Sequence, residues 1–466
     1  MGHEWPTVVE LAESVRRRER AAADVLDEAL AAIEAGNEAL NAFVHLAPAV
    51  ARRAAAAVDA AVARGEDPGP LAGVPFGVKD LEDCAGMPTS HGSVLFKGRP
   101  PVEHDSVHVG RLRAAGAVPV GKTATPEFGT LNFTKTKAWG TTRNPWDLSR
   151  TPGGSSGGSA AAVSAGLVPF GTASDGGGSI RIPAGFTGLG GHKASHGRIP
   201  EPGPDGSLTA VVGALTTTVA DAARHLDVAA GPDDRDRISL PAPGLRYEEA
   251  IEVLDVGGLR ARWSPDLGFA VVDAEVEAIA RAAAEALVGA AGLAADDGPV
   301  HLTDPVKAWL SAGAMDLWLS LGDDDWPGCA DDLTLYSRQV LEQTESYPVS
   351  RFARAHQLRA RLAADCAALF AEVDIVLTPT TAVAAFAAEG PPTAEIAGQH
   401  VHPAMSTPFT MLANLCWNPA VSVPAGTTEA GLPVGLQIMV GRHRDDRALR
   451  LARIAELATP WPRFAP

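Results

Sequence analysis

Apolar residues recur every three to four positions over much of the chain, which is the pattern of amphipathic helices. The pattern is clearest in the alanine-rich residues 7–65, which predict two or three helices. It returns over residues 104–116, over 159–168 and through most of 245–370. An acidic, tryptophan-containing segment at residues 321–332 interrupts the last region and predicts a loop there.

Short apolar runs bounded by glycine and proline alternate with these helices and predict strands. They lie at residues 74–78, 117–121, 374–380, 420–425 and 434–440. Strands interleaved with helices along the chain predict an α/β fold, with a mixed, twisted β-sheet sandwiched between helices. No internal repeat, charge block or Pro/Ser-rich linker divides the sequence. We therefore expect one large domain over all 466 residues.

Composition narrows the class of protein. The chain is 46% hydrophobic, enough for a large core, and its net charge of −17 argues against nucleic acid or an anionic membrane as a partner. No stretch of roughly 18 apolar residues predicts a membrane span. The N-terminal segment carries charges where a signal peptide needs its apolar stretch, so a cytoplasmic location is expected.

The sequence gives little evidence for a metal site. His104 and His108 are four residues apart, the spacing of two ligands on one helix face, but no HExxH motif or third ligand accompanies them. We interpret both as helical residues near the surface. His400 and His402 alternate without further ligands, and the four cysteines share no CxxC spacing, so neither zinc nor a redox pair is predicted.

The most informative stretch is glycine-rich and runs from residue 151 to 183. It places Ser155 and Ser179 in two glycine-rich turns separated by a short apolar run. Glycine lets backbone N–H groups approach a ligand closely, and a serine beside such donors has what acyl transfer needs, a nucleophile and an oxyanion site. The phosphate-binding GxxxxGK[ST] loop and the G-x-S-x-G elbow are both absent. As an isolated motif, GGSSGG would be a flexible linker, but the apolar flanks argue against that.

A serine nucleophile needs a base. Residues 71–80 predict an apolar strand that ends at Lys79. Burial disfavours the charged form of lysine and lowers its pKa, so Lys79 can act as a neutral general base without histidine. On its own, a lysine in this position would more often be an ordinary strand-end residue.

Taken together, these blocks resemble the amidase signature family of serine hydrolases. The two serines are 24 positions apart, as in the family pattern. The resemblance is weakest between about residues 240 and 370. It rests on GVPFGVKD (73–80), GAVPVGKTATPEFG (116–129), TPGGSSGGSAAAVSAG (151–166), SDGGGSIRIPAGFTGLGG (174–191), NPAVSVPAG (418–426) and GLPVGLQIMVG (431–441).

The resemblance implies a mechanism and a division of the chain. The triad would be Ser179 as nucleophile, Ser155 as the middle serine after a cis peptide bond from Gly154, and Lys79 as base, with no metal or cofactor. The N–H groups of Gly176, Gly177, Gly178 and Ser179 would form the oxyanion hole, with Asp175 and Arg181 as a supporting charge pair. The expected parts are N-terminal helices (1–65), the catalytic core (71–235), a variable region shaping the pocket (240–370) and the C-terminal part of the core (371–466).

Substrate choice depends on departures from the family pattern. Many members have GLKPSxGR where this chain has GHKASHGR (191–198), without the proline. Glutaminase subunits of tRNA-dependent amidotransferases usually carry glutamine where this chain has Ile182. The sequence SDGGGSIRIP (174–183) resembles instead that of stand-alone amidases that open cyclic nylon oligomers or cleave anilides and carbamates. A catalytically silent homologue is the third, least favoured alternative.

We therefore expect a monomeric or homodimeric hydrolase of small apolar or aryl amides, and of carbamates. The alternative is the glutaminase (A-type) component of a tRNA-dependent amidotransferase. The motif itself does not distinguish amide, anilide and urethane bonds. Aromatic walls suit apolar substrates, although each such residue could equally belong to the core. The expected pocket residues are Leu131, Phe133, Trp139 and Trp417, with Trp309, Trp318 and Trp326 in the neighbouring variable segments.

Overall fold

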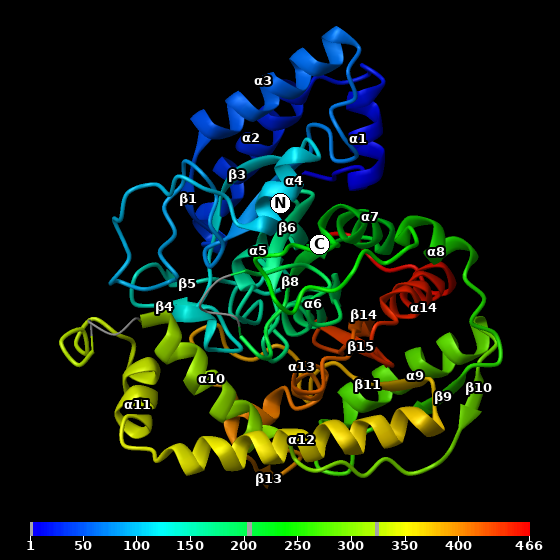
Figure 1. Ribbon diagram of the computed structural model, residues 1–466. Helices are drawn as coiled ribbons and strands as arrows, with labels where there is room; N and C mark the ends of the chain where they lie inside the picture. Colours follow the sequence, from blue (N-terminus) through cyan, green and yellow to red (C-terminus); the bar gives the residue numbers. More distant parts are fainter. Residues whose placement is uncertain (1–2, 203–206, 322–325) are drawn as a thin grey trace.

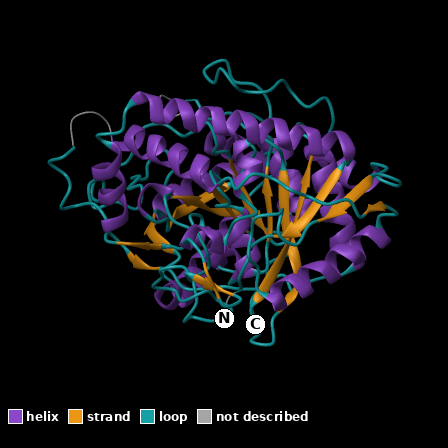
Figure 2. Ribbon diagram, turned by 90° about the horizontal axis from the view of Figure 1, so that it is seen from below, coloured by secondary structure: helices purple, strands orange, loops and turns teal. Residues whose placement is uncertain are grey.

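One large mixed sheet organises the molecule (Figures 1 and 2). The computed structural model describes residues 3–202, 207–321 and 326–466. Within these ranges, 11 strands form the sheet in the order β1-β3-β2-β6-β8-β7-β14-β15-β11-β9-β10. The β2 strand is parallel to both β3 and β6, and β9 is parallel to β10 and β11, whereas the other pairs are antiparallel. The predicted α/β class with a mixed sheet is confirmed.

The strands in sheet order are β1 (Phe43–Leu46), β3 (Val118–Thr123), β2 (Pro75–Lys79), β6 (Phe170–Ser174), β8 (Val212–Thr216), β7 (Gly190–Lys193), β14 (Ala420–Thr427), β15 (Pro433–Val440), β11 (Ile375–Pro379), β9 (Arg260–Trp263) and β10 (Ala294–Asp296). Two small hairpins lie apart from this sheet: β4 (Lys135–Thr136) with β5 (Gly140–Thr141), and β12 (Glu395–Ile396) with β13 (Gln399–His400).

Helices surround the sheet. The first begins where the Thr7 hydroxyl accepts the Glu10 N–H and the Glu10 carboxylate accepts the Thr7 N–H in return. The described helices are α1 (Val8–Arg16), α2 (Ala22–Leu40), α3 (Pro48–Arg64), α4 (Val107–Ala114), α5 (Gly157–Ser164), α6 (Arg181–Thr187), α7 (Val219–Ala229), α8 (Tyr247–Val253), α9 (Ala274–Ala290), α10 (Val306–Leu321), α11 (Leu335–Thr344), α12 (Val349–Glu372), α13 (Met411–Leu415) and α14 (Asp445–Ala458), with 3-10 turns at Glu127–Gly129 and Pro403–Ser406.

The alternation along β15 shows that the sheet is covered on both faces. Leu436 and Ile438 belong to the apolar cluster that includes residues of α7, α9 and α14. Gln437, between them, faces the opposite side and bonds to Arg181 of α6. Successive side chains of a strand point to opposite faces, so α6 lies on one face and α14 on the other. Figure 2 shows the helices on both sides of the fan of strands.

Several strands escaped the sequence prediction. β6, β7 and β8 are fully or largely buried and glycine-rich, so they show neither alternation nor a β-branched run. Gly171 lets β6 and α5 pack closely, because a Cβ there would lie 3.1 Å from the Ser159 Cβ. β1, β9 and β10 are short strands embedded in regions that we expected to be helical. Residues 322–325 of the predicted acidic loop lie outside the described residues.

The two ends of the chain meet. The Arg463 guanidinium donates a hydrogen bond of 2.8 Å to the carbonyl oxygen of Trp5, and Figure 1 places both termini near the centre of the view. Among the described residues, none of the helices has the length and apolar character needed to cross a membrane.

Candidate active site

Lys79 is the last residue of β2, and its side chain is completely buried. Its Nζ lies 2.8 Å from the Ser155 Oγ, 2.9 Å from the Ser156 Oγ and 2.8 Å from the Ser174 Oγ. Burial lowers the pKa of Lys79 to about 7, although nearby carboxylates act in the opposite direction. The structure therefore brings the predicted lysine and middle serine into contact, and sequence reasoning missed the other two hydroxyls.

The turn that carries Ser155 is tightly enclosed. The Gly154–Ser155 peptide bond is cis, as the resemblance implies. A Cβ at Gly154 would lie 2.6 Å from the Leu131 carbonyl oxygen and from the Phe133 amide nitrogen, so only glycine fits. α5 begins two residues after Ser155, which fixes this turn between the helix and the segment before β4.

Ser179 lies in the loop between β6 and α6, which we call the nucleophile loop (residues 175–180). Because β2 and β6 are parallel neighbours, their carboxyl ends share one edge of the sheet, and this places the loop beside Lys79. The Ser156 N–H donates a 3.3 Å hydrogen bond to the Ser179 carbonyl oxygen, which joins the two serine-bearing turns. The Ser179 side chain is only half-buried.

The backbone of the nucleophile loop is oriented through its carbonyl oxygens. The Asp175 carbonyl accepts from the Asn414 amide at 2.6 Å, the Gly176 carbonyl from Trp309 Nε1 at 3.2 Å, and the Gly178 carbonyl from the Ile182 N–H at 2.7 Å. In a trans peptide, the C=O and N–H point in opposite directions. The N–H groups of Gly176, Gly177 and Ser179 therefore point away from these anchors.

One predicted oxyanion donor must be corrected. The Gly178 N–H donates a 2.7 Å hydrogen bond to the Asp175 carboxylate, so it is not available to a substrate. Its orientation follows from the Gly177 carbonyl, which accepts from the Thr410 hydroxyl on the other side at 2.6 Å. The sequence prediction treated the glycines alike because it did not show where the Asp175 carboxylate points.

Asp175 and Arg181 form the predicted charge pair, with two contacts of 2.8 and 2.9 Å, and both side chains are completely buried. Although burial alone would raise it, the Arg181 charge and hydrogen bonds lower the pKa of Asp175 to about 2. Arg181 also donates to the side-chain oxygens of Asn414 and Gln437, each at 2.7 Å. We call these four residues the brace. Gln437 lies in a block that carried the family resemblance, whereas nothing in the sequence pointed to Asn414.

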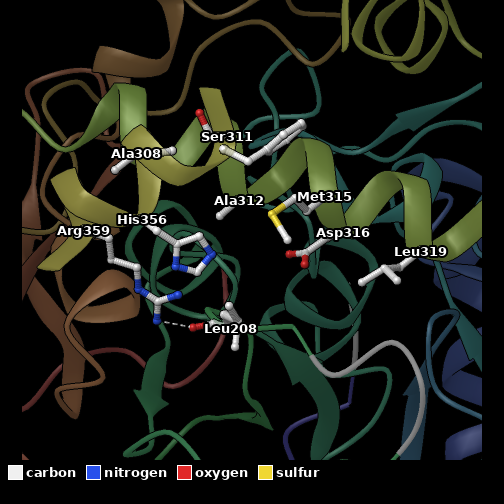
Figure 3. A pocket seen from close by; sticks show the side chains of 11 residues that line it. Leu208, Ala308, Ser311, Ala312, Met315, Asp316, Leu319, His356 and Arg359 are labelled. Carbon is white, nitrogen blue, oxygen red and sulfur yellow. Dashed lines mark hydrogen bonds between the residues drawn. The ribbon is translucent and has the colours of Figure 1, made fainter. Parts of the chain in front are cut away.

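A small apolar hollow of about 50 Å³ lies between α10, α12 and the segment around Leu208 (Figure 3). It adjoins the nucleophile loop through Trp309, which follows the lining residue Ala308. Residues of α10 and α12, which belong to the segment 240–370, form most of its lining. Its lining residues are Leu208, Ala308, Ser311, Ala312, Met315, Asp316, Leu319, Phe352, Ala355, His356 and Arg359.

None of the four predicted pocket residues lines this hollow. Phe133 is buried in an aromatic cluster with Phe186 and Phe386, and Leu131 packs against that cluster. Trp139 lies under the Lys97 ammonium, with 4.1 Å between Nζ and the ring centroid. Trp417, the fourth of these residues, stacks on His196, with 4.5 Å between the ring centroids. Trp318 and Trp326, expected in the neighbouring segments, pack edge-to-face on each other at a centroid distance of 6.1 Å. Among the predicted aromatics, Trp309 is the one that contacts the nucleophile loop.

The histidine interpretation was right in part: His108 is helical but buried, and His104 is exposed but not helical. α4 begins at Val107 because the Ser106 hydroxyl caps it, so His104 lies outside the helix and the two histidines do not share a helix face. His108 is buried rather than near the surface. No group of three or more potential metal ligands occurs within the described ranges. The four cysteines are buried, and within the described residues none of them forms a disulfide.

Comparison with known proteins defines the class. The model of the family described as Amidase matches residues 24–304 and 330–449. An acylamidase of Rhodococcus erythropolis is 34% identical over 98% of this chain and 96% of that protein. The A-type subunit of the glutamyl-tRNA(Gln) amidotransferase of Acidothermus cellulolyticus is 36% identical over 97% and 94%, respectively. The structure of a bacterial aryl acylamidase superposes with a TM-score of 0.92 at 29% identity, covering 98% of this chain and 97% of that one. The chain belongs to the amidase family, the amidase signature enzymes.

Proposed function

We propose that this amidase hydrolyses small apolar or aryl amides, and carbamates as well, through an acyl-enzyme formed on Ser179 and without a metal or cofactor. The observation that carries the proposal is the Lys79 amine, which is completely buried and surrounded by three hydroxyls. A neutral amine can donate two hydrogen bonds and accept one, so the roles of the three hydroxyls can be worked out.

Ser156 has a fixed role in this arrangement. Its hydroxyl donates to the Ser174 carbonyl oxygen at 3.2 Å, so it must accept from Lys79. The Ser174 hydroxyl takes the second amine hydrogen. The lone pair of neutral Lys79 then faces Ser155 and accepts its proton.

In the first step, Ser155 takes the Ser179 proton while passing its own to Lys79, and the Ser179 oxygen attacks the acyl carbon. The N–H groups of Gly176, Gly177 and Ser179 stabilise the oxyanion. The proton then returns through Ser155 to the leaving nitrogen, the C–N bond breaks, and an acyl-Ser179 ester remains. Water attacks this ester by the reverse use of the same relay and releases the acid. With a carbamate, the acid released is a carbamic or carbonic acid half-ester, according to which side of the carbonyl leaves.

Apolar substrates are supported by two features. Ile182, at the position where the alternative function would favour glutamine, is buried next to Phe133 and Phe186. A Cβ at Gly178 would lie 2.6 Å from the Ile182 Cδ1, so this apolar side chain lies directly behind the nucleophile loop. The hollow beside Trp309 is lined mostly by apolar side chains as well.

The glutaminase alternative is supported by the 36% identity to the A-type component of an amidotransferase. A hydrolysis panel separates the two functions: a nitroanilide, an aryl carbamate, a short aliphatic amide and free glutamine, each with the purified chain alone. We expect the anilide and carbamate to be hydrolysed and glutamine to be a poor substrate. Glutaminase activity that arises only with a second protein would contradict the proposal.

The nucleophile is tested separately. A sulfonyl fluoride should label Ser179 stoichiometrically, as mapped by peptide mass spectrometry, and Ser179→Ala should abolish labelling. A stoichiometric adduct on Ser155 would reverse the two roles.

The hollow is tested by filling it. Ala312→Trp should raise the KM for aryl amides and spare acetamide-sized substrates, because it occupies the space beside α10. Gly313→Ala on the same helix is the control, since its Cβ would meet nothing within 4 Å. Equal loss on both substrate types would place the binding site elsewhere.

A further inference from the structure

Three buried titratable residues form a line behind Lys79. Glu82 lies in the turn after β2, His108 on α4 and His225 on α7, and each is at most 6% exposed. His108 Nδ1 lies 2.7 Å from the Glu82 Oε2, and His108 Nε2 lies 2.7 Å from His225 Nε2. Both ring nitrogens of His108 are therefore engaged, one by a carboxylate and one by a second imidazole.

The chemistry of the three groups limits their proton positions. Although burial alone would raise it, the charge and hydrogen bond of His108 hold the pKa of Glu82 below its usual range, so Glu82 is a carboxylate that accepts from His108 Nδ1–H. Burial, together with the His108 and His192 rings, holds the pKa of His225 well below its usual range, so His225 is neutral. His108 can then donate a second proton to the His225 lone pair as an imidazolium, or accept from His225 as a neutral ring.

The line contacts Lys79 through the strand that carries it. The Glu82 N–H donates to the Lys79 carbonyl oxygen at 2.9 Å. The Thr172 hydroxyl accepts the Lys79 N–H at 2.9 Å and interacts with the Glu82 carboxylate. Glu82 has the largest effect on Lys79 of all the nearby charges, ahead of Asp175 and Glu201. Within the described ranges, His108 Nδ1 is the hydrogen-bond partner of the Glu82 Oε2, and no partner is found for the Oε1.

We propose that Glu82 is a positioning residue whose charge, balanced by His108 and His225, sets the fraction of Lys79 that is neutral and able to accept the Ser155 proton. Burial by itself makes the lysine a weak base, and a weak base takes a serine proton poorly. The Glu82 charge restores basicity, and the hydrogen bond from His108 Nδ1–H offsets part of that charge, so that Lys79 is not held in its ammonium form.

Other charges face these groups. Asp175 on the nucleophile loop and Glu201 act on Lys79. Lys122 of β3 donates to the Glu82 carbonyl oxygen, and its charge also acts on the Glu82 carboxylate. These groups remain in place in the variants described next, so a change in the pH dependence reports on Glu82 and His108. The inference rests on the proposed function, because Glu82 acts through Lys79.

The test compares Glu82→Gln and His108→Gln in the full chain by measuring kcat/KM for a neutral anilide from pH 5 to 10. Loss of the Glu82 charge should move the acid limb of the profile to lower pH by about one unit, with a lower plateau. Loss of the His108 hydrogen bond to the Glu82 carboxylate should move the limb to higher pH by a similar amount. His104→Gln, an exposed residue of the same type outside the helix, should leave the limb in place.

Opposite shifts from two residues in direct contact distinguish this role from a structural one, which would lower stability without moving the limb. Shifts in the same direction, or an unmoved limb in either variant, would overturn the proposal. If only one variant folds, the direction of its shift still decides. Lys79→Met serves as the separate check on the proposed function: full activity in that variant would refute the triad itself, whereas an inactive Lys79→Met with an unmoved Glu82→Gln limb would refute only the role of Glu82.

Discussion

Ser156→Ala is the substitution that best tests how the Lys79 amine is oriented toward Ser155. Its hydroxyl accepts one amine hydrogen at 2.9 Å while donating to the Ser174 carbonyl, so it fixes the rotation of the amine. Its loss leaves one hydrogen of a buried amine without its acceptor, which costs about 1–3 kcal/mol. If that energy holds the lone pair toward Ser155 in the transition state, kcat should fall about ten- to hundredfold with little change in KM.

The assay is the initial rate of nitroanilide hydrolysis, with single-turnover acylation measured alongside. Ser159→Ala is the matched control, because Ser159 is a buried serine of α5, the helix that begins directly after Ser156, and its hydroxyl donates to the Thr172 carbonyl instead of contacting Lys79. It should lower the melting temperature while leaving kcat within about threefold. Two results would refute the reasoning: unchanged kinetics in Ser156→Ala, or a loss as large as that of Ser155→Ala, which would make Ser156 part of the proton path.

Further predictions concern charge and space in the same site. Lys79→Arg should lose several orders of magnitude in kcat/KM, because a guanidinium keeps its proton; near-normal turnover would show that positive charge alone suffices. Wild-type activity should rise from pH 6 to 8 and level off above, since the pKa of Lys79 is about 7 and only the neutral amine accepts a proton. Gly177→Ala should be nearly inactive, because its Cβ would lie 2.1 Å from Trp309 Nε1, and Trp309→Ala should restore part of the activity. The pKa of Asp175 is lowered from 3.8 to about 2, so its stabilisation is present above pH 4 and lost as the pH falls toward 2; urea unfolding should show a shallower acid dependence in Asp175→Asn, and equal slopes would contradict this.

The local parts of the site were predictable because their signals are local. Glycine on both sides of a serine, and a lysine at the end of an apolar strand, describe backbone turns and burial that neighbouring residues decide. Asp175 and Arg181 are six residues apart, and their side chains are paired in the structure. The strand positions at residues 74–78, 420–425 and 434–440 were also confirmed to within a few residues.

Contacts between distant segments were not predictable. Asn414 reaches the Asp175 backbone from 239 residues away, and an asparagine in an apolar helix carries no mark of such a role. His108 had the appearance of a surface residue because its partners, Glu82 and His225, come from two other parts of the chain. The position of His104 outside the helix could have been predicted from the sequence, because Ser106 is a helix-capping residue and marks the start of α4.

The positions of the brace residues along the chain have a consequence for when the site can assemble during synthesis. Lys79, Ser155 and Ser179 emerge early in synthesis, but the side chains that hold Arg181 come from α13 and β15, near the end of the chain. A nascent polypeptide that stops before residue 411 carries all the reacting groups and lacks the parts that orient them. Two fragments divided at Gly398, in the exposed turn between β12 and β13, would separate the reacting groups from Asn414 and Gln437 in the same way. Hydrolysis would return only when the fragments associate, so turnover would serve as a direct readout of chain completion and of fragment complementation.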